Sequence, residues 1–331
     1  MMKKMTYNFA NRKVRIFLAT DLLDHLTETY QTTHEGFIIA DEKVPKHALD
    51  KLKNHYDIKH TIRIPSGDGS KSLSHYEAII DVMVEKEFTK ATTIFAVGGG
   101  MIADLCGFIA STYYRGVHLV HIPTTLLSMV DASIGGKTAL NFQPYKNIIG
   151  TFYQPKAILI DPNLLDTLPK RHFNNGFAEI IKIALVKDAK FFDDLLHDRL
   201  ILEDIITRAI ELKGAIVEED TFDKSVRHLL NYGHSIAHAL ESHYGTTYLH
   251  GECVAYGIKQ MSEGKPYYKD LLTVLKRYQL DLDIPYKKEA LFKHILHDKK
   301  RSKNILSIAL VDEPGKGYIK DIAVETFIDY L

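Results

Sequence analysis

Histidines and a glutamate in the second half of the chain are spaced as metal ligands often are. His234 and His238 are four residues apart, so on a helix both imidazoles face one side and can share an ion. His250 lies just beyond this segment, and Glu179 belongs to an earlier helical segment. Spacing alone predicts His234 and His238 as ligands and leaves the third ligand open. Ser235 stands where metalloproteases of the HExxH type have glutamate, so the pattern does not indicate protease chemistry.

The same segment predicts a long helix with a polar stripe. Over residues 224–244, Arg227, Asn231, His234 and His238 recur at helical spacing, and the remaining positions are mostly apolar. A helix with so much apolar surface is expected to be buried, so its stripe should line a wet or charged site. A stripe that simply faces solvent is the alternative.

Three consecutive glycines indicate a phosphate-binding turn. Gly98, Gly99 and Gly100 follow an expected strand at residues 92–97 and open a helix that carries Asp104 in its first turn. Glycine backbone can approach a pyrophosphate closely, and the helix N-terminus adds partial positive charge there. A tight turn without a ligand is the other interpretation.

Two further strand ends carry polar residues. Thr124 and Thr125 follow an expected strand at residues 117–122, and Asp41 follows one at residues 36–40. Ligands of open α/β sheets bind at such carboxyl ends. Asp41 is placed to accept hydrogen bonds from a ribose, although aspartate after a strand is also a common turn former.

The elements that position these residues change in character along the chain. The first half alternates apolar strand-like runs with helical patterns, which indicates a parallel sheet covered by helices. After about residue 168 the spacing is almost entirely helical, so we predict an α/β domain at 1–168 and a mainly α domain at 169–331. Strands are expected at residues 14–18, 36–40, 61–64, 92–97, 117–122 and 157–160; helices are expected at 21–30, 45–55, 72–85, 101–111, 125–132, 176–186, 202–218, 224–244, 253–261 and 320–331.

Bulk composition narrows the classes of function. The 331 residues include 42 Lys plus Arg and 42 Asp plus Glu, so no global basic field favours nucleic acid or an anionic membrane. No apolar run approaches the roughly 18 residues of a membrane helix, and the N-terminus lacks a signal-peptide core. Cys106 and Cys253 match no paired motif and are expected to be buried thiols. We therefore expect a cytoplasmic protein.

Taken together, the motifs resemble those of the 3-dehydroquinate synthases. The match runs in unbroken order from about residue 65 to residue 300, and it departs from the family pattern at Lys43, at residues 66–71 and at residues 220–225. The matching segments are residues 98–104, 107–108, 110–113, 115–116, 122–127, 131–137, 146–147, 178–182, 230–234, 250–252 and 298–300.

The resemblance implies a Rossmann-like NAD-binding domain followed by a mainly α domain, an architecture shared with iron-dependent alcohol dehydrogenases. It implies that Glu179, His234 and His250 bind zinc or cobalt with one position left open, and that His238 lies near the substrate. For substrate binding and catalysis it implies Arg115, Lys137, Lys146, Lys182, Lys213, Arg227 and Lys299 or Lys300, with Asn147, Asn231, Asp131 and His238. For NAD it implies Asp41, Gly67, Asp68, Lys71, Gly98, Gly99, Gly100, Met101, Ile102, Ala103, Asp104, Thr124, Thr125, Leu127, Asp131, Lys137, Lys146, Leu164, Leu165, Asp166 and Thr167.

The implied reaction converts 3-deoxy-D-arabino-heptulosonate 7-phosphate to 3-dehydroquinate and phosphate in the shikimate pathway, within a homodimer. NAD would oxidise the C5 hydroxyl, the metal would polarise the C4 and C5 oxygens, and His238 or Asp131 would handle protons. Phosphate would leave by β-elimination, the hydride would return, and an aldol step would close the ring.

Three other functions are compatible with parts of the pattern. A metal-dependent polyol or glycerol-phosphate dehydrogenase would release reduced cofactor, and another sugar-phosphate cyclase would take a substrate without a carboxylate. A non-catalytic nucleotide-binding protein would require loss of the site residues, all of which are present.

Overall fold

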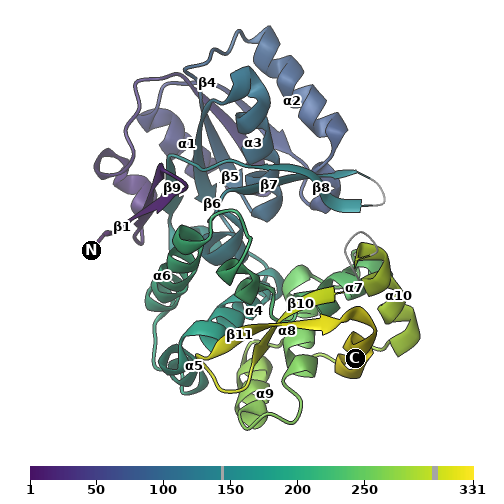
Figure 1. Cartoon of the computed structure of the whole chain (residues 1–331). Coiled ribbons are helices and arrows are strands. Elements are labelled where there is room, and N and C mark those ends of the chain that lie inside the picture. The colour runs from purple at the N-terminus through teal and green to yellow at the C-terminus, as the bar shows by residue number, and fades with distance from the viewer. Residues whose placement is uncertain (143–144, 300–304) are drawn as a thin grey trace. The chain divides into compact units, whose positions relative to one another are not determined.

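The computed structural model describes residues 1–142, 145–299 and 305–331, with side chains described up to residue 296 in the middle range. The chain forms two compact units, Met1–Pro169 and Lys170–Leu331. The first is an α/β unit and the second is mainly helical (Figure 1). No described helix is long and apolar enough to cross a membrane.

A seven-stranded sheet organises the first unit. Its order is β1-β2-β9-β6-β5-β3-β4, and β1 alone among these strands runs antiparallel to its neighbour. The six strands expected from the sequence are confirmed, whereas β1 was not expected. The bounds are β1 (Lys3–Phe9), β2 (Arg12–Leu18), β3 (Gly36–Asp41), β4 (Ile58–Ile64), β5 (Thr93–Gly98), β6 (His118–Pro123) and β9 (Ala157–Ile160).

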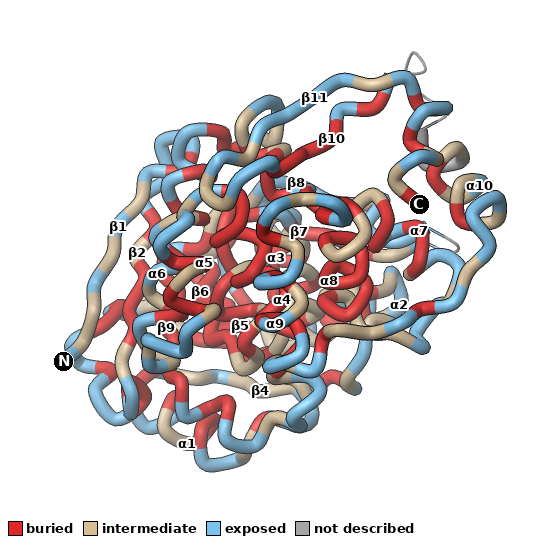
Figure 2. The backbone as a smooth tube through the Cα atoms, turned by 90° about the horizontal axis from the view of Figure 1, so that it is seen from below, coloured by how far each residue is buried: buried red, intermediate tan, exposed pale blue. Residues whose placement is uncertain are grey.

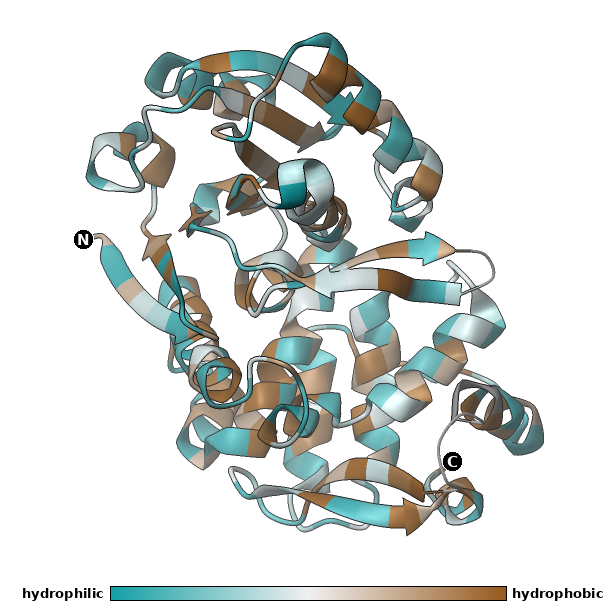
Figure 3. Cartoon of the chain, turned by 45° about the horizontal axis from the view of Figure 1, so that its top comes forward, coloured by the Kyte–Doolittle hydropathy of each residue, from teal (hydrophilic) through white to brown (hydrophobic). Residues whose placement is uncertain are grey.

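Helices cover both faces of this sheet, which explains why its central strands are mainly apolar and buried along almost their whole length. Phe37 and Ile39 of β3 pack on one face with α2 (Leu73–Glu85) and α3 (Gly100–Thr112). On the opposite face, Tyr56 at the end of α1 (Lys46–His55) packs on Phe95, with ring centroids 4.6 Å apart. Figure 3 shows inner strands of the sheet in brown, as mainly apolar bands.

The order of the strands reverses next to the glycine turn. The chain passes from β3 to β4 in one direction and then returns to place β5, β6 and β9 on the other side of β3. Ligands of open parallel sheets bind at the carboxyl ends of the two strands where the order reverses. In this sheet those strands are β3 and β5.

One helix predicted for the first unit is wrong, and one hairpin was missed. Residues 21–30 were expected to form a helix, but only the short 3₁₀ turns Leu22–Asp24 and Leu26–Glu28 form, because His25 between them leaves the helical region (φ −120°, ψ 31°). The hairpin of β7 (Lys137–Phe142) and β8 (Tyr145–Phe152) was not expected. It packs against α3, where a Cβ on Gly107 would lie 2.5 Å from the side chain of Thr138.

Seven helices and one hairpin build the described part of the second unit. The bounds are α4 (Lys170–Lys187), α5 (Ala189–Leu196), α6 (Leu202–Glu219), α7 (His234–Tyr244), α8 (His250–Met261), α9 (Tyr268–Arg277), α10 (Lys288–Lys299), β10 (Ile305–Val311) and β11 (Gly317–Ala323). Helices α4 and α8 pack on each other and are buried along most of their length (Figure 2). They form the centre of this unit.

Two expected helices of the second unit are wrong in part. The segment 224–244 is not continuous: a 3₁₀ turn, η7 (Val226–Asn231), is separated from α7 by Tyr232 and by Gly233, which is left-handed (φ 80°). The predicted stripe from Arg227 to His238 therefore does not lie on one helix. At the C-terminus, β11 and a 3₁₀ turn (Val324–Tyr330) replace the helix expected at residues 320–331.

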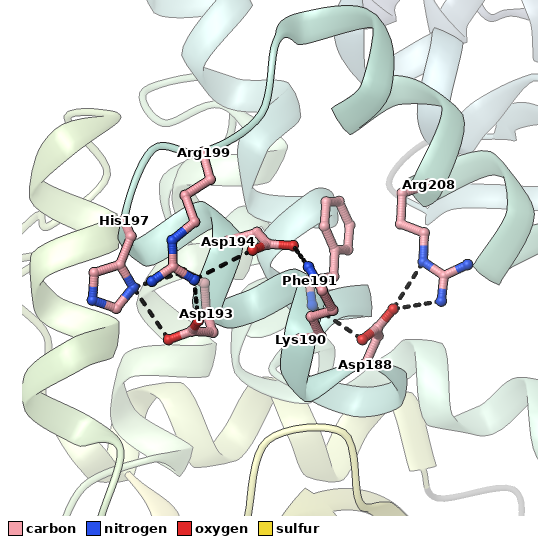
Figure 4. Close-up of polar contacts among 8 residues, drawn as sticks. All are labelled: Asp188, Lys190, Phe191, Asp193, Asp194, His197, Arg199 and Arg208. Atoms are coloured by element: carbon pink, nitrogen blue, oxygen red, sulfur yellow. Dashed lines mark hydrogen bonds and ion pairs between the residues drawn. The ribbon is translucent and has the colours of Figure 1, made fainter.

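Charged side chains fix α5 at its two ends (Figure 4). Asp188 accepts the backbone N–H of Phe191 and both Nε–H and Nη2–H of Arg208 on α6. At the other end, Arg199 pairs with Asp193, with 2.5 Å between Nη1 and Oδ2. This network attaches α5 to its neighbours and contains none of the predicted site residues.

Candidate metal and cofactor sites

Three side chains of the second unit converge as a metal site requires. Ligand atoms of Glu179, His234 and His250 all lie within 4.8 Å of one another. Glu179 Oε1 is 3.5 Å from Nε2 of His234 and 3.5 Å from Nε2 of His250. Zinc ligands at about 2.0–2.1 Å in a tetrahedron are about 3.3–3.4 Å apart, so the spacing matches.

The helices place these side chains by close backbone approach. Glu179 lies in the middle of α4, whereas His234 and His250 are the first residues of α7 and α8. A Cβ on Gly257 of α8 would lie 2.1 Å from the carbonyl oxygen of Gly233, the residue just before α7. Glycine at these positions lets the start of α7 reach α8 and brings the two imidazoles toward one carboxylate.

One buried oxygen indicates that the cluster is built for a cation. Glu179 is 3% exposed; its Oε2 pairs with the Lys182 ammonium, but its Oε1 accepts no hydrogen bond from any described residue. A buried carboxylate oxygen without a partner is costly. Because two imidazole nitrogens face the same oxygen, a divalent ion fits this arrangement.

Burial and neighbouring charges shift the pKa values of Glu179, His234 and His250 in different directions. Burial opposes ionisation of Glu179, but Lys182 and the two histidines together lower its pKa well below its usual range. Burial, assisted by Lys182, lowers the pKa of His234 well below normal. Burial also disfavours a charged His250, yet Glu179 and Glu241 outweigh it and raise the pKa of His250 to about 10. Without a metal, His250 therefore holds a proton that an ion would displace.

In both His234 and His250, Nε2 faces Glu179, and a contact at Nδ1 orients the ring. Nδ1 of His234 lies 3.3 Å from the carbonyl oxygen of Tyr232, and Nδ1 of His250 lies 3.3 Å from Oε1 of Glu241. Both acceptors take an N–H, so Nε2 would be the metal-binding nitrogen of each ring, in His250 after an ion displaces the second proton. Glu241 was missed from the sequence, although it is seven residues after His234 and so on the same helical face.

A second pair of contacts holds the start of α8 against α4. The Arg171 guanidinium binds both oxygens of Glu252 at 2.6 and 2.7 Å, and Glu252 also accepts the N–H of Leu249 at 2.8 Å. The N–H of Gly251 donates to Asn175 Oδ1 at 2.6 Å. No sequence pattern singles out Arg171 or Asn175, because the role of each depends on which helices pack together.

The other predicted residues of the second unit differ in exposure. His238 is exposed, with its ring centroid 5.5 Å from that of His234, and it is not part of the three-residue cluster. Lys182, Lys213 and Arg227 are buried on α4, α6 and η7, elements that pack on one another. Asn231 ends η7 and is exposed. Lys299 ends α10, but its side chain, like Lys300, lies outside the described residues.

In the first unit, the predicted cofactor segments gather at the carboxyl ends of adjacent parallel strands. Asp41 ends β3 and the glycine turn follows β5. The remaining segments follow β4 (Gly67, Asp68, Lys71), β6 (Thr124, Thr125, Leu127, Asp131) and β9 (Leu164, Leu165, Asp166, Thr167). Met101, Ile102 and Ala103 form the first turn of α3, and Asp104 lies just beyond it.

The glycine turn lies so close to its neighbours that side chains there would be crowded. Gly99 precedes α3, and a Cβ there would lie 3.1 Å from the side chain of Thr125; a Cβ on Gly100 would lie 3.1 Å from that of Ala132. The N–H groups of Thr124 and Ala103 are bonded to the carbonyls of Gly98 and Gly99, respectively. The first N–H groups of a helix have no partner within it, so this turn fits a dinucleotide pyrophosphate.

An ion-pair network borders this turn. Buried Lys71 lies 3.0 Å from Asp104 and 3.4 Å from Asp68, and Lys146 lies 3.8 Å from Asp68. Asn141 of β7 donates to Asp68 Oδ2 at 2.9 Å. The hairpin of β7 and β8 is therefore attached to the loop after β4.

Four more predicted residues of this unit lie in or near the hairpin or in a turn. Lys137 begins β7 and is exposed, and exposed Asn147 on β8 donates its backbone N–H to Asn141 Oδ1. Arg115 is exposed in the turn Tyr113–Arg115 and is left-handed (φ 60°). Asp131 belongs to the π-helical turn Ser128–Ala132 and is partly buried.

Family models and relatives of known sequence both match this chain to the same family. The family model described as 3-dehydroquinate synthase N-terminal matches residues 61–175, and the C-terminal model matches residues 176–301. A 3-dehydroquinate synthase of Clostridium botulinum (strain Alaska E43 / Type E3) is 35% identical, over 98% of this chain and 100% of the relative.

Solved structures agree on the fold. A 2-deoxy-scyllo-inosose synthase complexed with carbaglucose-6-phosphate, NAD+ and Co2+ aligns with a TM-score of 0.87 at 23% identity, over 99% of each chain. A 2-epi-5-epi-valiolone synthase from Streptomyces hygroscopicus subsp. jinggangensis 5008, with NAD+ and Zn2+ bound, aligns with a TM-score of 0.86 at 25% identity. It covers 99% of this chain and 96% of that one.

Proposed function

The chain belongs to the 3-dehydroquinate synthase family, and from this premise we propose that it forms 3-dehydroquinate and phosphate from 3-deoxy-D-arabino-heptulosonate 7-phosphate, with NAD and a divalent metal. The observation that carries the metal part is the orphaned buried oxygen of Glu179 facing two imidazoles. The glycine turn at the strand-order reversal supports the NAD part. The metal would be zinc or cobalt.

Glu179, His234 and His250 would hold the ion, which has room for substrate because only three protein ligands are present. When bound, the ion would polarise substrate oxygens as a Lewis acid, and NAD would accept and return a hydride. Lys182 keeps Glu179 ionised and therefore able to bind a cation.

The chain's cations match the charge of the substrate. A sugar acid phosphate carries a carboxylate and a phosphate, and each needs cationic partners. We assign this task to buried Lys182, Lys213 and Arg227 in the second unit and to exposed Lys137, Lys146 and Arg115 in the first, with Asn147, Asn231 and Lys299 as further contacts.

We assign proton handling to His238 and Asp131. His238 is exposed beside the His234 ring, so its imidazole can reach a substrate hydroxyl that approaches the ion. An imidazole exchanges protons near neutral pH. Asp131 is partly buried on a turn that follows β6.

The test is release of phosphate from the heptulosonate phosphate, with and without NAD and a chelator. We expect release to require both NAD and metal, without accumulation of reduced cofactor. Stoichiometric NADH would instead indicate a dehydrogenase, and equal turnover of a hexose phosphate without a carboxylate would indicate another cyclase. Full phosphate release after exhaustive chelation would contradict the metal assignment.

We also propose that the protein is a cytoplasmic homodimer that binds neither nucleic acid nor membranes. Both cysteines are free and buried, which suits a reducing compartment, and the formal net charge is zero. Sedimentation of the purified chain would test the dimer.

A further inference from the structure

Helix α7 carries a carboxylate, Glu241, next to the ring nitrogen of His250 that points away from Glu179. Glu241 follows His234 by seven residues, or two helical turns, so both side chains project from the same face of α7. That face meets the start of α8, where His250 is the first residue. The Glu241 side chain is 14% exposed, and its Oε1 lies 3.3 Å from Nδ1 of His250.

We propose that Glu241 is a positioning residue that fixes the His250 ring for metal binding and strengthens its Nε2 as a ligand. The inference rests on the proposed function, because it assumes a divalent ion at Glu179, His234 and His250. Glu241 does not bind the ion in this arrangement; it acts through the imidazole, whose Nδ1–H it accepts.

His250 depends on this contact more than His234 does. The Nδ1 acceptor of His234 is the carbonyl of Tyr232, a buried residue whose hydroxyl is bonded to Ser262 at 2.7 Å. The backbone therefore orients His234. His250 follows a turn that begins with left-handed Gly245, and its side chain is 32% exposed, so a side-chain acceptor must hold its ring. Without that acceptor, the ring can rotate and present the wrong nitrogen.

The negative charge of Glu241 should also strengthen metal binding. Lys182 pairs with Glu179 and offsets its negative charge, which weakens the attraction of the three-residue cluster for a divalent ion. The carboxylate of Glu241 supplies negative charge from beyond the imidazole. A carboxylate hydrogen-bonded to a metal-bound histidine raises the basicity of the ligand, and loss of such a partner typically costs about 10–100-fold in metal affinity.

The test measures zinc affinity of the metal-free full chain by competition with a chromophoric chelator. We compare the parent with Glu241→Ala, Glu241→Gln and the control Glu263→Gln, an exposed glutamate after α8. For Glu241→Ala we expect the Kd to rise about 10–100-fold. Glu241→Gln keeps an acceptor but loses the charge, so its Kd should rise by a smaller factor, and the control should match the parent.

Two further readouts separate positioning from a general loss of structure. The metal-free variants should keep the parent's far-ultraviolet circular dichroism spectrum, while the visible spectrum of the cobalt-loaded Glu241→Ala protein should change shape. Zinc Kd values for Glu241→Gln and Glu241→Ala within twofold of the parent would overturn the inference and leave the proposed function intact. A parent that binds no zinc would overturn the metal assignment and this inference together.

Discussion

At the scale of single residues, the buried pair of Glu179 and Lys182 shows how this site is prepared for a cation. Both side chains are at most 3% exposed, and they lie one helical turn apart on α4. Removal of one partner of a buried pair leaves an uncompensated charge, which costs about 3–5 kcal/mol. The pair therefore keeps a carboxylate ionised in a site that would otherwise neutralise it.

Replacement of Lys182 by methionine tests this role. The metal-free variant should lose about 3–5 kcal/mol in free energy of unfolding, and saturating zinc should restore part of that loss because the ion compensates Glu179. Urea unfolding with and without zinc measures both effects. Lys187→Met, at the exposed end of the same helix, is the control. An equal loss in the presence and absence of zinc would contradict the prediction.

Lys137 should matter far more for substrate turnover than for NAD affinity. Lys137→Ala removes a charge-assisted contact of about 1.5–3 kcal/mol, so kcat/KM should fall by about 10–100-fold. The Kd for NAD should stay within twofold by fluorescence titration. Exposed Lys156→Ala is the matched control. Parallel losses in kcat/KM and NAD affinity for Lys137→Ala would refute its assignment to the substrate.

Asp220 links pH to the placement of Arg227. Burial opposes ionisation of Asp220, but the backbone N–H groups of Lys224, Ser225 and Arg227 outweigh it and lower the pKa to about 2. Because the folded pKa lies below the usual 3.8, this stabilisation is present above pH 4 and is lost as pH falls toward 2.

Asp220→Asn should therefore reduce the free energy of unfolding by about 1 kcal/mol at pH 7, because hydrogen bonds to a charged acceptor stabilise a protein by about 1 kcal/mol more than those to a neutral one. The difference from the parent should shrink as the pH of the urea titration is lowered from 4 toward 2. A difference that stays constant over this range would show that the charge of Asp220 is not responsible.

At the scale of elements, the approach of α8 to α4 decides where His250 lies. A Cβ on Gly251 would lie 2.0 Å from the carbonyl oxygen of Asn175, which is backbone and cannot rotate away. Gly251→Ala should displace the start of α8 and reduce bound zinc, measured by elemental analysis, to well below one ion per chain. Gly69→Ala, where a Cβ would meet nothing within 4 Å, should retain the parent's zinc content. Full zinc occupancy in Gly251→Ala would contradict this account.

The sequence predicted elements well where one period persists and poorly where glycine interrupts it. The buried strands and α6 follow their apolar patterns. The period continues across Gly233, so a single helix was expected at 224–244, but the left-handed glycine breaks it and separates Arg227 from His234. The hairpin of β7 and β8 was missed because β8 is largely exposed and lacks an apolar face of its own.

The same limit applies to the metal site. The spacing of residues along the chain predicted His234 and His238 as ligands, because spacing relates only residues that are close in sequence. The third ligand required the resemblance, since Glu179 lies 55 residues before His234 in the sequence and reaches it only through the packing of α4. The seven-residue spacing between His234 and Glu241 could have indicated that both lie on one helical face. The contact of Glu241 with His250, however, depends on where α8 begins.

At the scale of the whole molecule, the two compact units divide the chemistry. We propose that the strand ends of the first unit bind the dinucleotide and that Glu179, His234 and His250 of the second unit bind the metal. The reaction requires both, so each should be titratable separately: the purified chain should bind NAD after chelation and zinc without NAD.

The central claim is that one carboxylate and two imidazoles of the second unit hold a divalent ion. X-ray absorption at the zinc edge of the zinc-loaded, NAD-free protein tests it most directly. We predict two imidazole nitrogens and low-atomic-number oxygen ligands, all at about 2.0–2.2 Å. A zinc shell that contains sulfur, or one without imidazole scattering, would contradict the account.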